Sequence, residues 1–107
     1  MAPDPQVLNE LVRRTVDAVH PLRIILFGSA ARGEMGPDSD LDVLVVMPDG
    51  CQPRAVTRFL YSQLRGFGYA KDLVVVRQSD VEQYGSNPYL VIHTALSEGQ
   101  ELYRVVT

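Results

Sequence analysis

The hydrophobic and polar positions of this chain follow two patterns, amphipathic stretches with helical spacing and short, nearly continuous apolar runs. The amphipathic stretches predict helices over residues 3–19, 53–65 and 88–98. In the second of these, the side chains expected to face the core are Val56, Phe59, Leu60 and Leu64. Asp4 followed by Pro5 is typical of a helix start and places the beginning of the first helix.

The apolar runs predict strands over residues 22–27, 40–47 and 69–76. A single helical turn is expected at 29–33, between the first two strands. Residues 78–84 are expected to form a polar connection, and residues 102–105 a short extended tail. This order of elements predicts an α/β domain with a small mixed β-sheet and helices packed against it.

Composition narrows the class of protein. The chain has 107 residues, 46% hydrophobic and 21% charged, which suits one folded domain over residues 1–107. The formal net charge of −3 argues against a broad, basic DNA- or RNA-binding face. Cys51 is the only cysteine, so no internal disulfide can form. No leader peptide or apolar run of about 20 residues is evident, so we expect a cytoplasmic protein without a membrane span.

Acidic residues stand at the polar ends of two predicted strands. Asp40 and Asp42 open the second strand, and side chains two residues apart point to the same face. Asp72 lies near the beginning of the third strand, and neighbouring strands are about 4.8 Å apart. Each aspartate alone is more typical of a turn or a solvated charge. Three carboxylates at one place, however, suit one or two Mg²⁺ ions that also bind substrate phosphates.

A glycine–serine turn precedes the carboxylates. Gly28 and Ser29 follow the first apolar run and offer backbone N–H groups and a hydroxyl, which suit phosphate oxygens. Arg32, one turn further on, is placed to neutralise phosphate charge, although a surface ion pair with Glu34 or Asp38 explains it equally well. The residues alone therefore predict a site for a metal ion and a phosphate group.

This spacing resembles the nucleotidyltransferase superfamily that includes DNA polymerase beta, and most closely its minimal members, such as the MntA-type antitoxins. The family pattern is Gly-Ser, a gap of about ten residues and Asp-x-Asp, and residues 28–42 here read GSAARGEMGPDSDLD. Asp72 falls where the family places a third carboxylate, and residues 97–103 resemble the end of a minimal member. The likeness covers nearly the whole chain and implies the polymerase-beta-like nucleotidyltransferase fold.

The resemblance also implies a role for each motif residue. Gly28 and Ser29 would hold the triphosphate of ATP. Asp40, Asp42 and Asp72 would ligate two Mg²⁺ ions, with Asp42 bridging them and Asp72 serving in addition as general base. The implied reaction is transfer of AMP from ATP to a hydroxyl group, with release of pyrophosphate.

A partner is implied too, because a chain of this length leaves no room for the acceptor-binding domain of larger members. Minimal members act as antitoxins of type VII toxin–antitoxin systems by adding AMP to a tyrosine of a helical HEPN toxin, which is our first hypothesis. A second is an antitoxin that acts by binding alone, for which Tyr89 and Ile92 are candidate contacts. A third is transfer to a small molecule such as an aminoglycoside, with a homo-oligomer completing the pocket.

Overall fold

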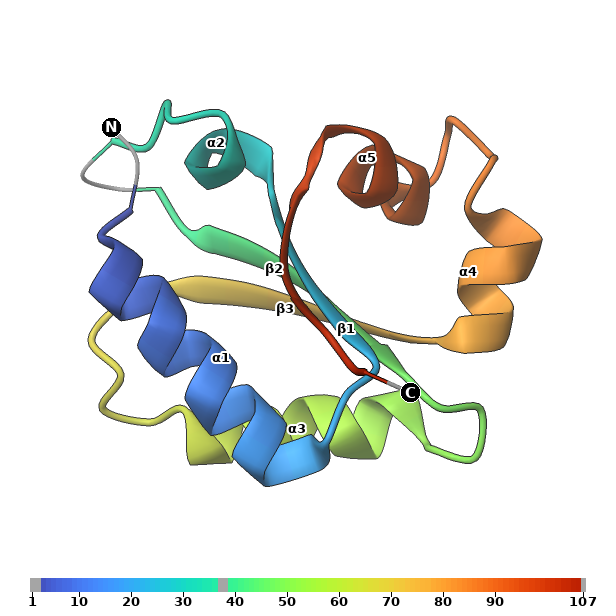
Figure 1. The fold of residues 1–107 in the computed structure, drawn as a ribbon, viewed down its shortest axis with the longest axis horizontal. Helices are drawn as coiled ribbons and strands as arrows, with labels where there is room; N and C mark the ends of the chain where they lie inside the picture. The colour runs from blue at the N-terminus through green and yellow to red at the C-terminus, as the bar shows by residue number, and fades with distance from the viewer. Residues whose placement is uncertain (1–2, 37–38, 107) are drawn as a thin grey trace.

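The structure is a computed structural model that describes residues 3–36 and 39–106. The elements follow one another as α1 (Pro5–Val19), β1 (Arg23–Phe27), α2 (Gly28–Ala31), β2 (Leu41–Met47), α3 (Pro53–Gln63), β3 (Lys71–Arg77), α4 (Gln78–Tyr84), α5 (Val91–Glu98) and β4 (Gln100–Arg104). Figure 1 shows a twisted sheet with α1 and α3 on one side and α4 and α5 on the other. None of the described helices is long and apolar enough to cross a membrane.

The sheet is mixed, as the sequence predicted. Its strand order is β3-β2-β1-β4, so β3 and β4 are the edge strands. β2 runs parallel to β3, and β1 runs antiparallel to both β2 and β4. The parallel pair is joined through α3, which is the connection that two parallel neighbours require.

β2 explains how the sheet separates two cores. Leu41, Val43 and Val45 are fully buried against the layer formed by α1 and α3. Leu44 and Val46 point the other way and pack with residues of α5. Burial on both faces accounts for the unbroken apolar run in the sequence. The alternation also places the side chain of Asp42 on the α5 side of the sheet.

Two segments that the sequence predicted to be irregular are regular. Residues 78–84 form α4, whose first turn is closed by the Asp80 carboxylate accepting the Arg77 N–H at 2.9 Å. The segment lacks an apolar stripe, because Val81 alone packs on the core and no residue of α4 is buried. The expected tail at residues 102–105 belongs to β4, which pairs with β1 along the edge of the sheet.

The predicted core face of α3 was wrong at one position. Leu60 and Leu64 are fully buried and Val56 packs against the same core cluster, whereas the side chain of Phe59 is 47% exposed. The buried stripe of this helix is only one residue wide, at positions i, i+4 and i+8. Phe59, three residues after Val56, falls beside that stripe and faces solvent.

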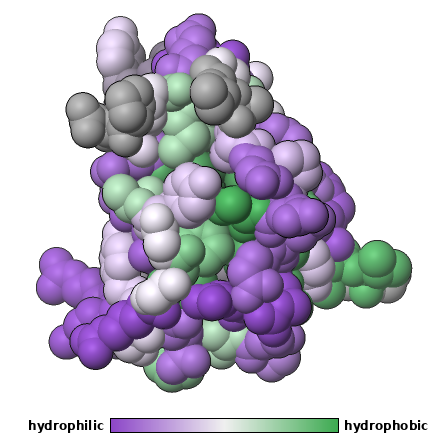
Figure 2. Space-filling model, turned by 90° about the vertical axis from the view of Figure 1, so that its left-hand side faces the viewer, coloured by the Kyte–Doolittle hydropathy of each residue, from purple (hydrophilic) through white to green (hydrophobic). Residues whose placement is uncertain are grey.

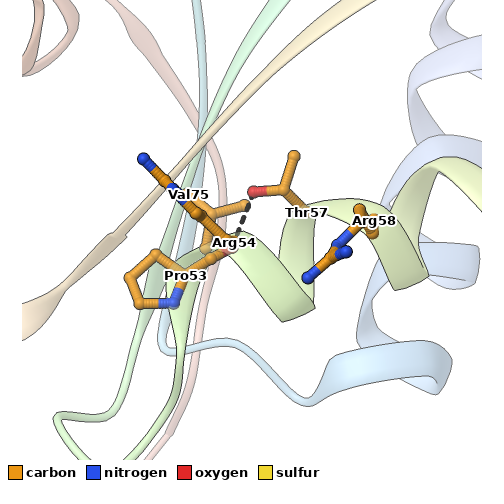
Figure 3. A pocket seen from close by; sticks show the side chains of 5 residues that line it. All are labelled: Pro53, Arg54, Thr57, Arg58 and Val75. Carbon is orange, nitrogen blue, oxygen red and sulfur yellow. Dashed lines mark hydrogen bonds between the residues drawn. The ribbon is translucent and has the colours of Figure 1, made fainter.

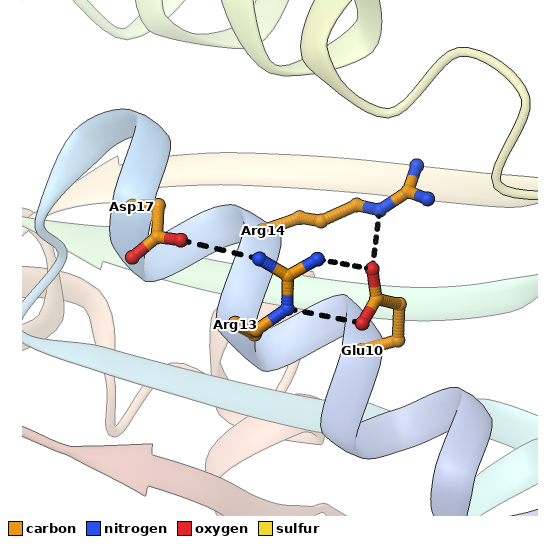
Figure 4. Close-up of polar contacts among 4 residues, drawn as sticks. All are labelled: Glu10, Arg13, Arg14 and Asp17. Atoms are coloured by element: carbon orange, nitrogen blue, oxygen red, sulfur yellow. Dashed lines mark hydrogen bonds and ion pairs between the residues drawn. The ribbon is translucent and has the colours of Figure 1, made fainter.

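The outer face of α1 carries a cluster of charges. Glu10 accepts hydrogen bonds from both Arg13 and Arg14, and Asp17 lies 3.5 Å from Arg13 (Figure 4). The hydrogen bonds from Arg13 and Arg14 lower the pKa of Glu10 to about 2. Every arginine on this helix therefore has an acidic partner, which distinguishes α1 from α3.

Acid should weaken the ion pair between Arg23 of β1 and Glu101 of β4. Hydrogen bonds from Arg104, and then from Arg23, lower the pKa of Glu101 from 4.5 to about 2. A lowered pKa means that this stabilisation is complete above pH 4.5 and is lost as the pH falls towards 2. We expect Glu101→Gln to lower the free energy of unfolding by about 1 kcal/mol or less at pH 7. The difference from the original protein should vanish near pH 2, as measured by urea denaturation, and Glu98→Gln is the matched control.

Candidate active site

Asp40, Asp42 and Asp72 stand near the points where β2 and β3 begin. Figure 2 views the molecule from this end. Asp42 and Asp72 are register partners on neighbouring parallel strands, so their side chains leave the same face of the sheet. Asp40 stands one residue before β2 and is exposed, as is Asp72. Burial is the largest cause that raises the pKa of Asp42, followed by the charges of Asp72 and Asp40. The structure thus brings the three carboxylates within electrostatic reach of one another.

Gly28 lies directly against Asp42. The φ angle of Gly28 is +72°, and a Cβ atom at this position would collide with Oδ2 of Asp42. The contact arises because Phe27, the last residue of β1, pairs with Asp42 across the antiparallel strands. A glycine suits phosphate access here, as the sequence predicted, but the contact with Asp42 was not predicted. It depends on where the pairing of β1 with β2 ends, which no local pattern of residues reveals.

Ser29 is the second residue of the short helix α2, which begins one residue before the predicted turn at 29–33 and ends two residues before its end. Its backbone C=O accepts a hydrogen bond from the N–H of Glu34 at 2.9 Å. Its side chain is half-buried, and its hydroxyl has no hydrogen-bond partner among residues 3–36 and 39–106. The hydroxyl is therefore available to a ligand.

Arg32 follows α2 and takes part in two interactions. Its Nε donates to the Glu34 carboxylate at 3.1 Å, and its side chain is 46% exposed. This contact is the surface ion pair that the sequence offered as the alternative to phosphate binding. Asp38, the other suggested partner, lies outside the described residues. The charge of Arg32 also lowers the pKa of Asp42, against the larger effects that raise it. Arg32 therefore lies close enough to influence the carboxylates while it is held by Glu34.

The carboxylates suit a hard cation chemically. Carboxylate oxygens are the ligands that Mg²⁺ prefers, and within the described part of the chain none of the three aspartates makes an ion pair or hydrogen bond that competes with a cation. In that same part, no three His, Cys, Asp or Glu side chains are grouped closely enough to hold a metal ion. Three negative charges repel one another, and the exposed Asp40 and Asp72 side chains are free to turn outward. The ligand set stays a prediction from the sequence.

The glycine–serine turn beside an Asp-x-Asp strand is matched by a protein family. Residues 6–96 match the sequence model of the nucleotidyltransferase domain. The chain belongs to this family. No curated protein matches this nucleotidyltransferase domain by sequence.

Solved structures show the same fold for this nucleotidyltransferase domain. A chain of a toxin–antitoxin crystal structure with AMP-PNP is 20% identical, with a TM-score of 0.69 over 92% of this chain and 73% of that one. A mutant of the toxin–antitoxin MntA–HpeT gives 18% identity and a TM-score of 0.68 over the same shares. The tri-AMPylated Shewanella oneidensis HEPN toxin in complex with MNT antitoxin gives 18% and 0.63, over 94% and 71%. The polymerase-beta-like nucleotidyltransferase fold is therefore confirmed.

Proposed function

We propose that this nucleotidyltransferase domain transfers AMP from ATP to a tyrosine hydroxyl of a HEPN-type toxin and so acts as its antitoxin. The observation that supports the chemistry is the contact between Gly28 and Asp42, next to the register-matched Asp72. It sets a turn suited to phosphate directly against a pair of carboxylates. The choice of partner is supported by the AMPylated HEPN toxin that is bound to an MNT antitoxin in one structural relative.

The proposed reaction exchanges one bond at phosphorus for another. The hydroxyl oxygen of the acceptor bonds to the α-phosphorus of ATP, the bond from that phosphorus to its bridging oxygen breaks, and pyrophosphate leaves. Asp72 takes the hydroxyl proton, a role that suits an exposed carboxylate on an edge strand, which a partner's side chain can reach. The backbone of Gly28 and the free hydroxyl of Ser29 hold the triphosphate oxygens.

Asp40, Asp42 and Asp72 would hold Mg²⁺, as two ions. When bound, the metal supplies positive charge that neutralises the triphosphate and the charge developing on its oxygens. The fit rests on the donor atoms and on the environment of Asp42, whose pKa is raised first by burial and then by the charges of Asp72 and Asp40, a repulsion that a cation would relieve. Arg32 can exchange its exposed pairing with Glu34 for a phosphate oxygen, because surface ion pairs are weak.

Binding without transfer is the second candidate function, and an exposed aromatic residue favours it. Tyr89 lies in the loop before α5 with its side chain 93% exposed. Ile92, the other suggested contact, is 7% exposed and belongs to the core, so packing inside the domain explains this residue. Tyr89 is thus the apolar contact that this alternative retains.

Labelling with ATP separates transfer from binding. The protein is incubated with α-³²P-labelled ATP, Mg²⁺ and a HEPN-type partner, and we expect the label on a tyrosine of the partner, located by mass spectrometry. The double variant Asp40→Ala, Asp42→Ala should bind the partner but leave it unlabelled. Labelling that survives both changes would contradict the proposed site. If the double variant, which cannot label the partner, still suppresses the toxin fully, binding alone is sufficient.

A further inference from the structure

The outer edge of β3 offers backbone groups to a partner. β3 has a neighbouring strand on one side only, because β2 is its sole partner in the described sheet. In a parallel pair, alternate residues direct both backbone groups to the neighbour. The C=O of Ala70 accepts the Leu41 N–H at 2.9 Å, so residues 72, 74 and 76 also face β2. Leu73, Val75 and Arg77 therefore direct their N–H and C=O groups to the free edge.

Two of these outward N–H groups are already satisfied by side chains. The Leu73 N–H donates to the hydroxyl of Tyr61 at 3.0 Å, and the Arg77 N–H donates to Asp80 at 2.9 Å. Val75 lies between them, and no side chain of the described chain bonds its backbone groups. The edge is thus protected at both ends and leaves one donor and one acceptor together at Val75.

A basic hollow adjoins this open position. The hollow has a volume of about 450 Å³, and its walls are Pro53, Arg54, Thr57, Arg58 and Val75 (Figure 3). Arg54 and Arg58 are exposed, and neither has an ion-pair partner among the described residues. α3 contains no acidic residue that could serve as one, in contrast to α1 with Glu10 and Asp17.

We propose that this edge binds an extended, acidic segment of a partner protein. One residue of the segment exchanges both backbone hydrogen bonds with Val75, in the manner of an added edge strand. Its carboxylates on the side towards α3 pair with Arg54 and Arg58. The spacing of the two arginines matches that of two such carboxylates. Residues four apart on a helix are separated by a rise of about 6 Å, and residues two apart on a strand by about 6.6 Å.

Other occupants fit the edge less well. A phosphate or a nucleic acid backbone offers mainly acceptors there, so it would pair with the arginines and leave the C=O of Val75 unsatisfied. The net charge of −3 also disfavours a nucleic acid. A second copy paired through β3 would bring Arg54 and Arg58 against the same residues of its partner, with unfavourable repulsion.

The test uses a fluorescent nonapeptide of alternating Thr and Glu, which presents its carboxylates on one face when extended. We expect binding by fluorescence anisotropy, and protection of the Val75 amide from hydrogen exchange by about tenfold or more. A peptide with Lys in place of Glu should not bind. Arg58→Glu should weaken binding about tenfold or more. Arg65→Glu makes the same charge change in the turn that follows α3, outside the hollow, and should change the affinity less than about threefold.

Each contrary result overturns the proposal. Equal weakening by the two variants would indicate only a long-range charge effect. Binding without protection of Val75 would exclude strand pairing. Complete displacement of the peptide by inorganic phosphate at equal concentration would indicate an anion site. A dimer of the free protein that the acidic peptide dissociates would indicate that a second copy occupies the edge.

Discussion

Asp42→Asn should abolish nucleotidyl transfer and leave the fold as stable as before or more so. Asparagine keeps the shape but removes the charge that would hold a cation, so we expect kcat/KM to fall at least about 100-fold. The pKa of Asp42 is raised by burial and by Asp72 and Asp40, so its ionised form is disfavoured in the folded state. A neutral side chain removes both the cost of burying a charge and its repulsion by Asp72 and Asp40 at neutral pH, so the Tm should be equal or higher.

Loss of transfer together with an unchanged or higher Tm would separate a role in the reaction from a role in stability. Asp17→Asn, which changes a mainly exposed carboxylate on α1, is the matched control and should affect neither transfer nor Tm. A lower Tm for Asp42→Asn would mean that loss of transfer reflects loss of structure. Transfer that persists in the variant would exclude Asp42 as an essential ligand. Calorimetry and the labelling assay together give both quantities.

Gly28→Ala should have the second large effect, on stability and transfer together. A residue with a Cβ atom at a positive φ costs about 1–2 kcal/mol. At Gly28 the new methyl group would also collide with the Asp42 carboxylate, which adds about 1–3 kcal/mol of strain or displaces that side chain. We expect transfer to fall at least about 100-fold, since the turn and the carboxylate can no longer touch.

Gly66→Ala is the control that isolates the collision. Gly66 has a φ of +76°, close to the +72° of Gly28, but a Cβ atom there would meet nothing within 4 Å. It should therefore cost the backbone strain alone and leave transfer unchanged. If the two variants are equally stable and equally active, the contact between Gly28 and Asp42 has no importance for the site.

The sequence predicted the elements that have a continuous or periodic apolar pattern and missed α4 and β4, which have none. β1, β2 and β3 and the helices α1 and α3 have cores of continuous or periodic apolar residues, so their patterns were visible. α4 is fixed by the Asp80 carboxylate and buries no residue. β4, with sequence QELYR, is held by backbone pairing with a strand far away in the sequence. Neither a cap nor a long-range pairing leaves a periodic pattern.

The candidate site was predictable to a similar extent. The sequence predicted that Asp72 lies on the strand next to that of Asp42, and the register of β2 and β3 agrees. The contact of Gly28 with Asp42 depends on where the antiparallel register ends, which no local pattern records. The basic hollow was not predicted for another reason, because Arg54 and Arg58 fall outside the apolar stripe of α3, where charged side chains are usually solvated. The absence of acidic residues along α3 was the available signal.

The pairing of β1 with β4 has a consequence for how this chain folds as it is made. Arg23 in β1 faces Arg104 in β4, so one side of β1 stays unpaired until the much later β4 has been synthesised. Until then the open edge of β1 is exposed to wrong pairing, and contacts so distant along the chain slow folding. The turn at Gly28 continues directly from β1. The end of the sheet that carries the candidate site is therefore completed only after β4 has paired with β1.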